Sequence, residues 1–379
     1  MRVLIVSHSG KTSGGAEQSL MALVRCVAQE RADVRLTMLF PSDGQSALRA
    51  FAERLGVETL CAPYHRLCFA KTNVKPLRYG KLALLHLSDR WRSGRLAKRL
   101  RGRFDMVYSN TSVVFFGAFL ARRLRLPHVW HIREFGREYG IRFLPGADRC
   151  RDRLTDRFLF TSRALLDSYR GRCREEKMRV VYNGIAYRPG PARKEHDGIH
   201  MLITGSIQRQ KGQYFALQAL EKLKNYRGGV CLHIAGNFVD TEERDRILDF
   251  VRRASLEEKV VFHGYVEDMP ALRSQMDMEL ICSQCEGFGR STVEGMMSGL
   301  TVIAADCGAT PEILRDRETG FLYPPGDLDR FVELIATLAE DAALRDRVGR
   351  AAQKDAIERF TLERYAAQVV REWEEVCAD

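Results

Sequence analysis

The sequence predicts an α/β protein with two domains, each built on a parallel sheet covered by helices on both faces. Its 379 residues exceed the size at which a single hydrophobic core stops growing. Short apolar runs typical of buried strands alternate with segments of helical periodicity, and this alternation occurs twice along the chain. Hydrophobic residues make up 45% of the chain, which is enough to fill two cores of ordinary size.

The residue patterns place both series of elements along the chain. In the first series, strands are expected over residues 2–6, 34–40, 105–109, 128–132 and 157–160, and helices over 16–29 and 113–124. In the second series, strands are expected over 200–204, 230–235, 259–262, 278–281 and 301–304, and helices over 213–224, 242–253, 292–298 and 327–339. A last helix is expected over 362–377.

A segment rich in proline, glycine and charge separates the two series. Residues 187–198 hold two prolines and two glycines, so they are the expected linker. We therefore expect an N-terminal domain over 1–186, a C-terminal domain over 199–360, and a C-terminal helical segment over 361–379.

The formal net charge of +11 is concentrated in one segment. Residues 64–103 hold twelve Lys or Arg residues and a single acid, Asp89, so the rest of the chain is balanced. Tyr64, Phe69, Tyr79 and Trp91 are interleaved with these cations, a mixture that suits the interface of an anionic membrane. A solvated helix face, or a patch for an anionic soluble acceptor, is the alternative interpretation.

Cysteine usage and the N-terminus indicate a reducing compartment. The ten cysteines are scattered, and the Cys282–Cys285 pair lacks a second pair or a histidine ligand pattern, so free thiols and no zinc site are expected there. No stretch reaches the roughly 18 apolar residues of a membrane span. Residues 1–6 form an apolar run without the features of a signal peptide, so we expect a cytoplasmic protein.

The first strand leads into a glycine-containing loop over residues 7–17 that opens a helix. Gly14 and Gly15 let the backbone approach a ligand, and a helix N-terminus favours an anion. The P-loop pattern fails because Ile5 stands where its first glycine is required, and the GxGxxG fingerprint is missing. The loop is therefore either an anion-binding turn or a plain strand-to-helix turn.

The second domain opens with a similar strand, glycine and loop. Gly205 ends the strand, and Arg209 and Lys211 follow it before the next helix. Ligands of open α/β sheets bind outside the carboxyl ends of the strands, and these two cations suit a diphosphate. Two solvated loop cations would give the same pattern.

The strongest signal is the segment 285–299, which follows the strand expected over 278–281. Glu286 stands on a glycine-rich turn and Glu294 lies eight residues later, inside the next helix. Carboxylates accept bidentate hydrogen bonds from vicinal hydroxyls, which suits ribose or a hexose. The amides of residues 289–292 would point at a phosphate. A glycine-phenylalanine-glycine turn is costly unless the backbone must approach something, so two plain surface acids are the weaker interpretation.

The E-x7-E element from Glu286 to Glu294 resembles that of the retaining glycosyltransferases of the GT-B fold, family 4 type. Further matching motifs occur in the family's order: Gly14-Gly15-Ala16-Glu17, Val180-Val181-Tyr182-Asn183-Gly184, Gly205 with Lys211-Gly212, and Gly308-Ala309-Thr310-Pro311-Glu312 with Thr319-Gly320. The resemblance implies two Rossmann-like domains with parallel sheets facing across a cleft that holds the active site. It also implies that the last helix crosses back to the N-terminal domain.

The resemblance assigns a role to particular residues. It implies that Lys211 and a neighbouring Arg stabilise the leaving diphosphate, that Glu286 holds the transferred sugar, and that Glu294 holds the donor ribose. The expected catalytic residues are His131, Arg209, Lys211 and Glu286. The expected donor-binding residues are Gly14, Gly15, Gly205, Gly264, Tyr265, Val266, Phe288, Gly289, Arg290, Ser291, Thr292 and Glu294. The expected acceptor-binding residues are Glu17, Asn110, Arg133 and Glu134. No metal ion and no cofactor are expected.

One position departs from the family pattern. Many members carry arginine directly after the glycine of the Lys-Gly motif, whereas this chain has Ser206. Arg209 is the expected source of that positive charge.

The expected function is transfer of a sugar, with retention, from a UDP- or GDP-sugar to a lipid-linked or polysaccharide precursor in cell-surface glycan synthesis. The expected enzyme is cytoplasmic and peripheral on the inner face of an anionic membrane, with no nucleic-acid partner. A related GT-B enzyme, such as a phosphorylase or a sugar-nucleotide epimerase, is the first alternative. A nicotinamide oxidoreductase lacks its fingerprint here, and a non-enzymatic anion-binding protein leaves Lys211, Glu286 and Glu294 unexplained.

Overall fold

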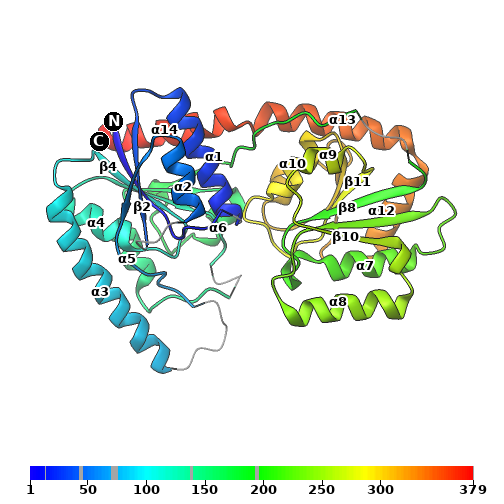
Figure 1. The fold of residues 1–379 in the computed structure, drawn as a ribbon, viewed down its shortest axis with the longest axis horizontal. Coiled ribbons are helices and arrows are strands. Elements are labelled where there is room, and N and C mark those ends of the chain that lie inside the picture. The colour runs from blue at the N-terminus through cyan, green and yellow to red at the C-terminus, as the bar shows by residue number, and fades with distance from the viewer. Residues whose placement is uncertain (13, 42–45, 70–75, 137–139, 193–195, 379) are drawn as a thin grey trace. The chain divides into compact units, whose positions relative to one another are not determined.

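The structure, a computed structural model, describes residues 1–12, 14–41, 46–69, 76–136, 140–192 and 196–378. Residues 70–75 of the basic segment and 193–195 of the expected linker lie outside the described residues. The chain forms two compact units (Figure 1). Unit 1 comprises residues 1–184 together with 362–379, and unit 2 comprises residues 185–361.

Unit 1 is built on a seven-stranded parallel sheet in the order β3-β2-β1-β4-β5-β6-β7. The strands are β1 (Arg2–Val6), β2 (Arg35–Phe40), β3 (Glu58–Cys61), β4 (Met106–Asn110), β5 (His128–Ile132), β6 (Arg157–Phe160) and β7 (Met178–Val180). The helices are α1 (Gly15–Glu30), α2 (Ala47–Arg54), α3 (Pro76–Leu100), α4 (Phe116–Leu124), α5 (Ala147–Arg153), α6 (Arg163–Ser168) and α14 (Leu362–Ala378), with a short 3-10 turn at Glu175–Lys177.

Unit 2 is built on a six-stranded parallel sheet in the order β10-β9-β8-β11-β12-β13. The strands are β8 (Ile199–Thr204), β9 (Val230–Ala235), β10 (Val260–Gly264), β11 (Met278–Ile281), β12 (Thr301–Ala305) and β13 (Phe321–Tyr323). The helices are α7 (Gln213–Lys222), α8 (Thr241–Ala254), α9 (Met269–Arg273), α10 (Arg290–Met297), α11 (Thr310–Ile313), α12 (Leu328–Glu340) and α13 (Ala342–Arg359), with 3-10 turns at Arg209–Lys211 and Glu257–Lys259.

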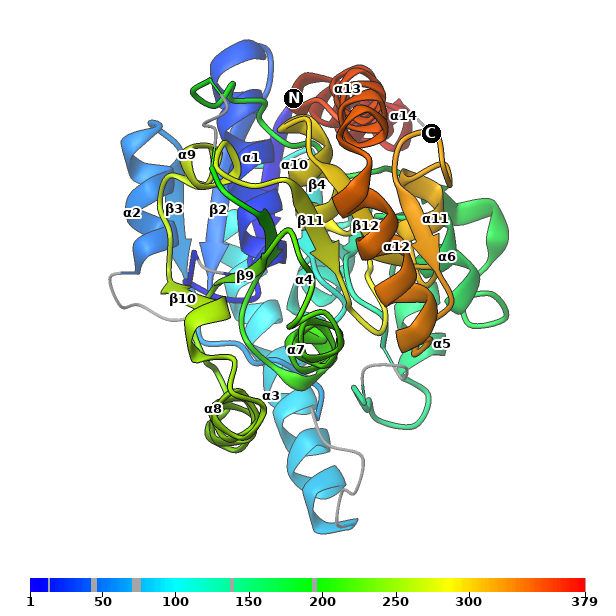
Figure 2. The ribbon, with the colours of Figure 1, turned by 90° about the vertical axis from the view of Figure 1, so that its right-hand side faces the viewer.

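Alternation along the strands gives each sheet two buried faces. In unit 1, Val3 and Ile5 face α1, α2 and α14, whereas Leu4 and Val6 face α3 and α4. In unit 2, the face that carries Met201 packs against α7, α8 and α12, and the face that carries Leu202 packs against α9 (Figures 1 and 2). The predicted α/β class with parallel sheets is confirmed, because every strand pairing in both sheets is parallel.

Helix ends follow the capping rules that the sequence carries. Helix α8 begins where the Asp240 side chain accepts a hydrogen bond from the amide of Glu242, and acidic residues occupy its first turn. It ends with arginines in the last turn and with Ser255 in the left-handed conformation at φ 51°.

Helix α3 carries most of the basic segment and is longer than any helix expected from the sequence. Its exposed side includes Leu84, Leu87 and Trp91, which are 69%, 60% and 61% exposed. One expectation for this segment is corrected: Tyr64 is not at the surface but is buried, with its hydroxyl within hydrogen-bonding distance of the carbonyls of Ser7 and Leu39. Among the described residues, no helix is long and apolar enough to cross a bilayer.

Helix α14 completes the core of unit 1, although it follows all of unit 2 in the sequence. Val369, Val370 and Trp373 are fully buried, and the Trp373 ring lies edge-on to Tyr108 of β4 at a centroid distance of 5.2 Å. Arg157 of β6 forms a buried ion pair with Glu372 at 2.5 Å. The sheet of unit 1 therefore depends on the last helix for one of its packing partners.

We expect Trp373→Ala to lower the free energy of unfolding of unit 1 by about 3–5 kcal/mol, because it removes the largest apolar contact of α14. The matched control is Trp91→Ala, which removes an exposed indole and should change stability by less than about 0.5 kcal/mol. Urea unfolding followed by tryptophan fluorescence measures unit 1 in both variants, because all three tryptophans lie in unit 1 and both variants keep the buried Trp130. Equal midpoints for the two variants would contradict the role given to α14.

Candidate active site

The candidate site of unit 2 lies at the carboxyl ends of β8 and β11, which are neighbours in the sheet. The loop after β8 contains Lys211, and the loop after β11 contains Glu286. The amide of Gln284 donates a hydrogen bond of 3.0 Å to the carbonyl of Gln210, so the two loops are joined through their backbones. Open parallel sheets bind ligands at this edge.

Glycine is required at two close backbone contacts of these loops. Gly212 has φ 74°, and a Cβ at this position would lie 2.2 Å from the carbonyl oxygen of Cys282. Gly308, in the loop after β12, has φ 56°, and a Cβ at this position would lie 2.6 Å from the carbonyl oxygen of Glu286. No other residue fits either position without moving backbone, so the loops are held close together.

An ion pair joins the two loops at the centre of the site. Lys211 Nζ donates a hydrogen bond of 2.6 Å to Glu286 Oε1. The two side chains are 29% and 15% exposed, so both charges remain accessible to a ligand. The backbone carbonyl of Glu286 accepts from the amide of Ala309 at 2.9 Å, which fixes the position of the glutamate.

Helix α10 directs its N-terminus into the same region. Its N-cap is Gly289 at φ 85°, which has no side chain that could accept a hydrogen bond from the first turn. Backbone amides in the first turn of a helix have no partner within the helix and favour an anion. The Thr292 hydroxyl in this turn is buried and has no hydrogen-bond partner among the described residues. The first turn of α10 is therefore a suitable place for a phosphate.

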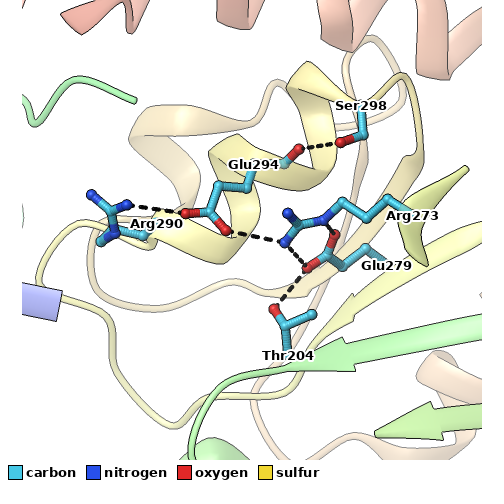
Figure 3. A network of polar contacts seen from close by, with 6 residues as sticks. All are labelled: Thr204, Arg273, Glu279, Arg290, Glu294 and Ser298. Atoms are coloured by element: carbon cyan, nitrogen blue, oxygen red, sulfur yellow. Dashed lines mark hydrogen bonds and ion pairs between the residues drawn. The ribbon is translucent and has the colours of Figure 1, made fainter. Parts of the chain in front are cut away.

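Glu294 is held by two arginines (Figure 3). Arg290 lies 3.2 Å from Glu294 Oε1, and Arg273 lies 3.2 Å from Glu294 Oε2. Arg273 also makes two hydrogen bonds to Glu279, at 2.8 and 3.0 Å, and the Thr204 hydroxyl donates to Glu279 at 2.8 Å. This network joins α9, β11, β8 and α10, and it orients the Glu294 carboxylate, which stays 26% exposed.

The Arg273–Glu279 pair is buried and was missed by the sequence analysis. Both side chains are less than 5% exposed. Burial acts to lower the pKa of Arg273, but the charges of Glu279 and Glu294 outweigh it and raise the pKa above its ordinary value. A glutamate inside the apolar run Met278–Ile281 was the available sequence signal, because a buried carboxylate requires a partner.

The other residues that the sequence predicts for the donor side differ in exposure and in the elements that carry them. Arg209 is exposed and has no ion-pair partner among the described residues. Gly264 ends β10, its carbonyl accepts from the Gly236 amide at 2.7 Å, and the following Tyr265 is 73% exposed. Val266 packs against a small apolar cluster beside α9. Phe288 is buried, and Ser291 is half-buried in the first turn of α10.

Unit 1 has its own polar cluster at the carboxyl ends of β4 and β5. His131 Nδ1 lies 2.6 Å from the Tyr108 hydroxyl, whereas Nε2 is buried without a partner among the described residues. Burial, together with the charge of Arg133, holds the pKa of His131 well below its usual value, so the imidazole is neutral. The structure therefore places His131 inside the unit rather than at its surface.

Arg133 lies beside His131 and is also buried. Its guanidinium donates to Asn110 Oδ1 at 2.5 Å, to Asn183 Oδ1 at 2.6 Å and to the Tyr365 hydroxyl at 2.7 Å. Among the described residues, no carboxylate pairs with it. Since arginine cannot lose its proton in a protein, this cluster carries an uncompensated positive charge.

The other acceptor-side residues belong to separate contacts. Glu134 accepts from the amide and the hydroxyl of Ser112, at 2.8 and 2.7 Å. Glu17 is buried and pairs with His8 at 2.9 Å. Burial acts to raise the pKa of Glu17, but hydrogen bonds from His8 and Ser9 and the charge of His8 outweigh it and lower the pKa to about 2. Gly14 is the N-cap of α1 and Gly15 its first residue.

Comparison with known proteins places both halves of the chain in related families. Residues 13–187 match the model described as Glycosyltransferase Family 4, and residues 189–355 match the model described as Glycosyl transferases group 1.

Among curated relatives, the N-acetyl-alpha-D-glucosaminyl L-malate synthase of Bacillus anthracis is 29% identical over 34% of this chain. The lipopolysaccharide 1,6-galactosyltransferase of Escherichia coli is 27% identical over 42%, and the phosphatidyl-myo-inositol mannosyltransferase of Mycobacterium leprae is 29% identical over 44%. The chain spans 34%, 46% and 44% of the lengths of these relatives.

Solved structures share the whole fold. The Anabaena protein HepE, in complex with UDP and glucose, superposes with a TM-score of 0.78 at 22% identity and 99% coverage of both chains. A glycosyltransferase from Rickettsia africae superposes with a TM-score of 0.81 at 14% identity, covering 99% of this chain and 98% of its own. At these identities the likeness establishes the fold, and the predicted GT-B fold is confirmed.

We expect Arg273→Met to lower the free energy of unfolding of unit 2 by about 3–5 kcal/mol, because it leaves Glu279 buried without its partner. Adding Glu279→Leu should recover most of that loss, since no buried charge is then unpaired. The control, Arg252→Met, removes an exposed ion pair and should cost less than about 1 kcal/mol. Hydrogen exchange of the β8 and β11 amides measures the free energy of unfolding of unit 2. No recovery in the double variant would show that the pair is not the cause.

Proposed function

Because this chain belongs to glycosyltransferase family 4, we propose that it transfers a sugar from a nucleotide-sugar donor to a membrane-associated acceptor. The observation that carries the proposal is the accessible Lys211–Glu286 ion pair next to the uncapped N-terminus of α10. A cation, a carboxylate and a set of backbone amides are the groups that a sugar diphosphate requires. UDP is the first nucleotide to test, since HepE was solved with UDP.

Different residues of the site contact the diphosphate, the ribose and the sugar of the donor. The diphosphate lies against the first turn of α10, with Lys211 stabilising the negative charge that develops as the anomeric bond breaks. Glu294, held by Arg273 and Arg290, accepts hydrogen bonds from the ribose hydroxyls. Lys211 then leaves Glu286 for the phosphate, and Glu286 is released to accept hydrogen bonds from the transferred sugar. Arg209 is a second cation for the diphosphate.

Transfer proceeds with retention and without a metal ion. The acceptor attacks from the face that the diphosphate leaves, and the departing phosphate takes the acceptor's proton. The positive charge of Lys211 and the backbone N–H groups of the first turn of α10 take the place of a divalent cation in stabilising the charge of the diphosphate. Within the described part of unit 1, Arg133 has no carboxylate partner and His131 Nε2 has no hydrogen-bond partner, and both observations support contact with polar groups of the acceptor.

Helix α3 supports a lipid surface as the place of the acceptor. Leu84, Leu87 and Trp91 recur at helical spacing, so they form one exposed apolar stripe. Exposed cations stand at its ends, Lys81 before it and Arg95 after it, and the Arg95 guanidinium lies 4.9 Å from the centroid of the Trp91 ring. An apolar stripe with flanking cations is typical of helices that lie in the interface of an anionic membrane.

A basic pocket next to α3 fits the anionic group of such an acceptor. The cavity has a volume of about 500 Å³. Its lining includes the arginines Arg90, Arg122, Arg123, Arg149 and Arg153. Two of the relatives described above are named for lipopolysaccharide and phosphatidyl-myo-inositol, both of which are lipids, and this also supports a lipid-linked acceptor in surface glycan synthesis.

We expect Lys211→Ala and Glu286→Gln to lower the rate of donor cleavage by about 10- to 1000-fold, because each removes a group that acts on the reacting end of the donor. Glu294→Ala should instead mainly weaken nucleotide binding. The donor is first identified by thermal shift with UDP- and GDP-sugars, rates are followed by nucleoside diphosphate release, and binding is measured by calorimetry. Lys224→Ala, an exposed lysine on the same unit, is the control.

Comparing the loss of rate with the loss of diphosphate affinity shows whether Glu286 acts on the sugar or only supports nucleotide binding or the fold. Glu286→Gln should leave the affinity for the free diphosphate almost unchanged, because that ligand lacks the sugar. A loss of diphosphate affinity equal to the loss of rate would mean that Glu286 binds the nucleotide or supports the fold. Wild-type rates in both Lys211→Ala and Glu286→Gln would refute the assigned site.

We expect the protein to float with vesicles that contain anionic lipid and not with neutral vesicles, and binding should weaken as salt rises. Leu84→Glu and Leu87→Glu, introduced together, should abolish flotation by placing charge in the apolar stripe. The control is Leu248→Glu, which adds the same charge to an exposed leucine of α8. If the double variant still floats, or if the unchanged protein does not float with anionic vesicles even at low salt, this surface is ruled out.

A further inference from the structure

A row of histidines crosses three neighbouring strands of unit 2. His200 lies on β8, His233 on β9 and His263 on β10. His200 Nδ1 is 2.9 Å from His233 Nε2, and His233 Nδ1 is 2.8 Å from His263 Nε2. Neither the donor chemistry nor the acceptor surface described above uses these side chains.

Cys231 completes the row into a cluster. It stands two residues before His233 on β9, so both side chains leave the same face of the sheet. The register pairs Cys231 with His200 on β8. One ligand atom from each of His200, Cys231 and His233 can be chosen so that all three atoms lie within 4.8 Å of one another. His200 and Cys231 are half-buried, so an ion from solvent can reach them.

A backbone carbonyl decides which nitrogen of His200 is available. His200 Nε2 lies 3.1 Å from the carbonyl oxygen of Asp197, which can only accept a hydrogen bond. Neutral His200 therefore keeps its proton on Nε2 and presents a lone pair at Nδ1. Neutral His233 has two possible tautomers. With its proton on Nε2 it donates a hydrogen bond to His200 Nδ1, and with its proton on Nδ1 it donates a hydrogen bond to His263 Nε2.

The second of these states leaves an open metal site. With its proton on Nδ1, His233 presents a lone pair at Nε2, next to the lone pair of His200 Nδ1 and the Cys231 sulfur. Each histidine then donates its remaining N–H, His200 to the Asp197 carbonyl and His233 to His263. Metal-binding histidines in proteins are held in this way, by an acceptor at the second nitrogen.

We propose that His200 Nδ1, Cys231 Sγ and His233 Nε2 bind a transition-metal ion of the Zn²⁺ class, with His263 as an outer partner. Imidazole and thiolate are the ligands that zinc prefers. Zinc holds two nitrogens at roughly 2.05 Å, which places them about 3.3 Å apart in tetrahedral geometry, so the 2.9 Å pair must widen by a few tenths of an ångström. The thiol proton of Cys231 goes to solvent, and water completes the coordination.

This ion would act on stability and not on sugar transfer. It joins β8 and β9 near the start of β8, whereas the candidate active site begins at Gly205, five residues along the same strand from His200. That separation is roughly 16 Å in an extended strand. An ion that binds only the folded chain stabilises it in proportion to the logarithm of its concentration. The inference is independent of the function proposed above.

The test uses the full chain, stripped with a chelator and titrated with Co²⁺. We expect saturation at about one equivalent per chain, with a thiolate-to-cobalt charge-transfer band and the intense visible bands of four-coordinate cobalt. Cys231→Ser should lose the charge-transfer band, and His263→Ala should keep it but bind about 10- to 100-fold more weakly. Cys377→Ser removes the exposed cysteine and should leave the spectrum unchanged.

Thermal unfolding of each metal-free variant shows whether it is folded, and Zn²⁺ should raise the midpoint of the unchanged chain but not that of Cys231→Ser. His200→Gln provides a second variant and should also lose saturable binding. Retention of the charge-transfer band in Cys231→Ser, or no saturable binding of Co²⁺ by the unchanged chain, would overturn the proposal. These readouts do not involve a sugar donor.

Discussion

The buried ion pair of Arg273 and Glu279 is the constraint on which the unit 2 site depends. Removing two charges from water costs several kcal/mol each, and only short, complete hydrogen bonding offsets that cost. Glu279 achieves it with two bonds from Arg273 and one from Thr204. Nη2 of Arg273, which donates to Glu279, also donates to Glu294, so a buried side chain fixes the position of a partly exposed carboxylate. A ligand that uses Glu294 meets a group that is already oriented.

In unit 1, the buried Arg133 is stabilised by neutral oxygens and not by a carboxylate. Arg133 is enclosed by amide and hydroxyl oxygens, and their dipoles stabilise its charge without neutralising it. The neighbouring His131 responds by staying neutral. The cluster is therefore positive as a whole, whereas the Arg273 network of unit 2 contains two carboxylates for two arginines.

Sequence reasoning succeeded where a local pattern decides the structure. The strands over 128–132 and 278–281 were predicted with their observed bounds, because both are short apolar runs between polar segments. Lys211 and Glu286 were singled out from their places after two strands, and the structure brings their side chains within 2.6 Å of each other. Their roles, and that of Glu294, stay predictions. Arg273 was missed because its partner comes from another element, and only the fold brings them together. The burial of Tyr64 was also missed, since its two acceptor carbonyls, on Ser7 just after β1 and on Leu39 in β2, are distant in the sequence.

The place of α14 has a consequence for the order in which the chain folds during synthesis. Residues 1–184 emerge from the ribosome first, yet their core includes Val369, Val370 and Trp373, which emerge only after the whole of unit 2. Unit 2 is continuous in sequence and can complete its core while α14 is still being made. The earlier-made unit thus has part of one apolar face of its sheet uncovered until α14 has been made, and this part is exposed to chaperones and to aggregation for that interval.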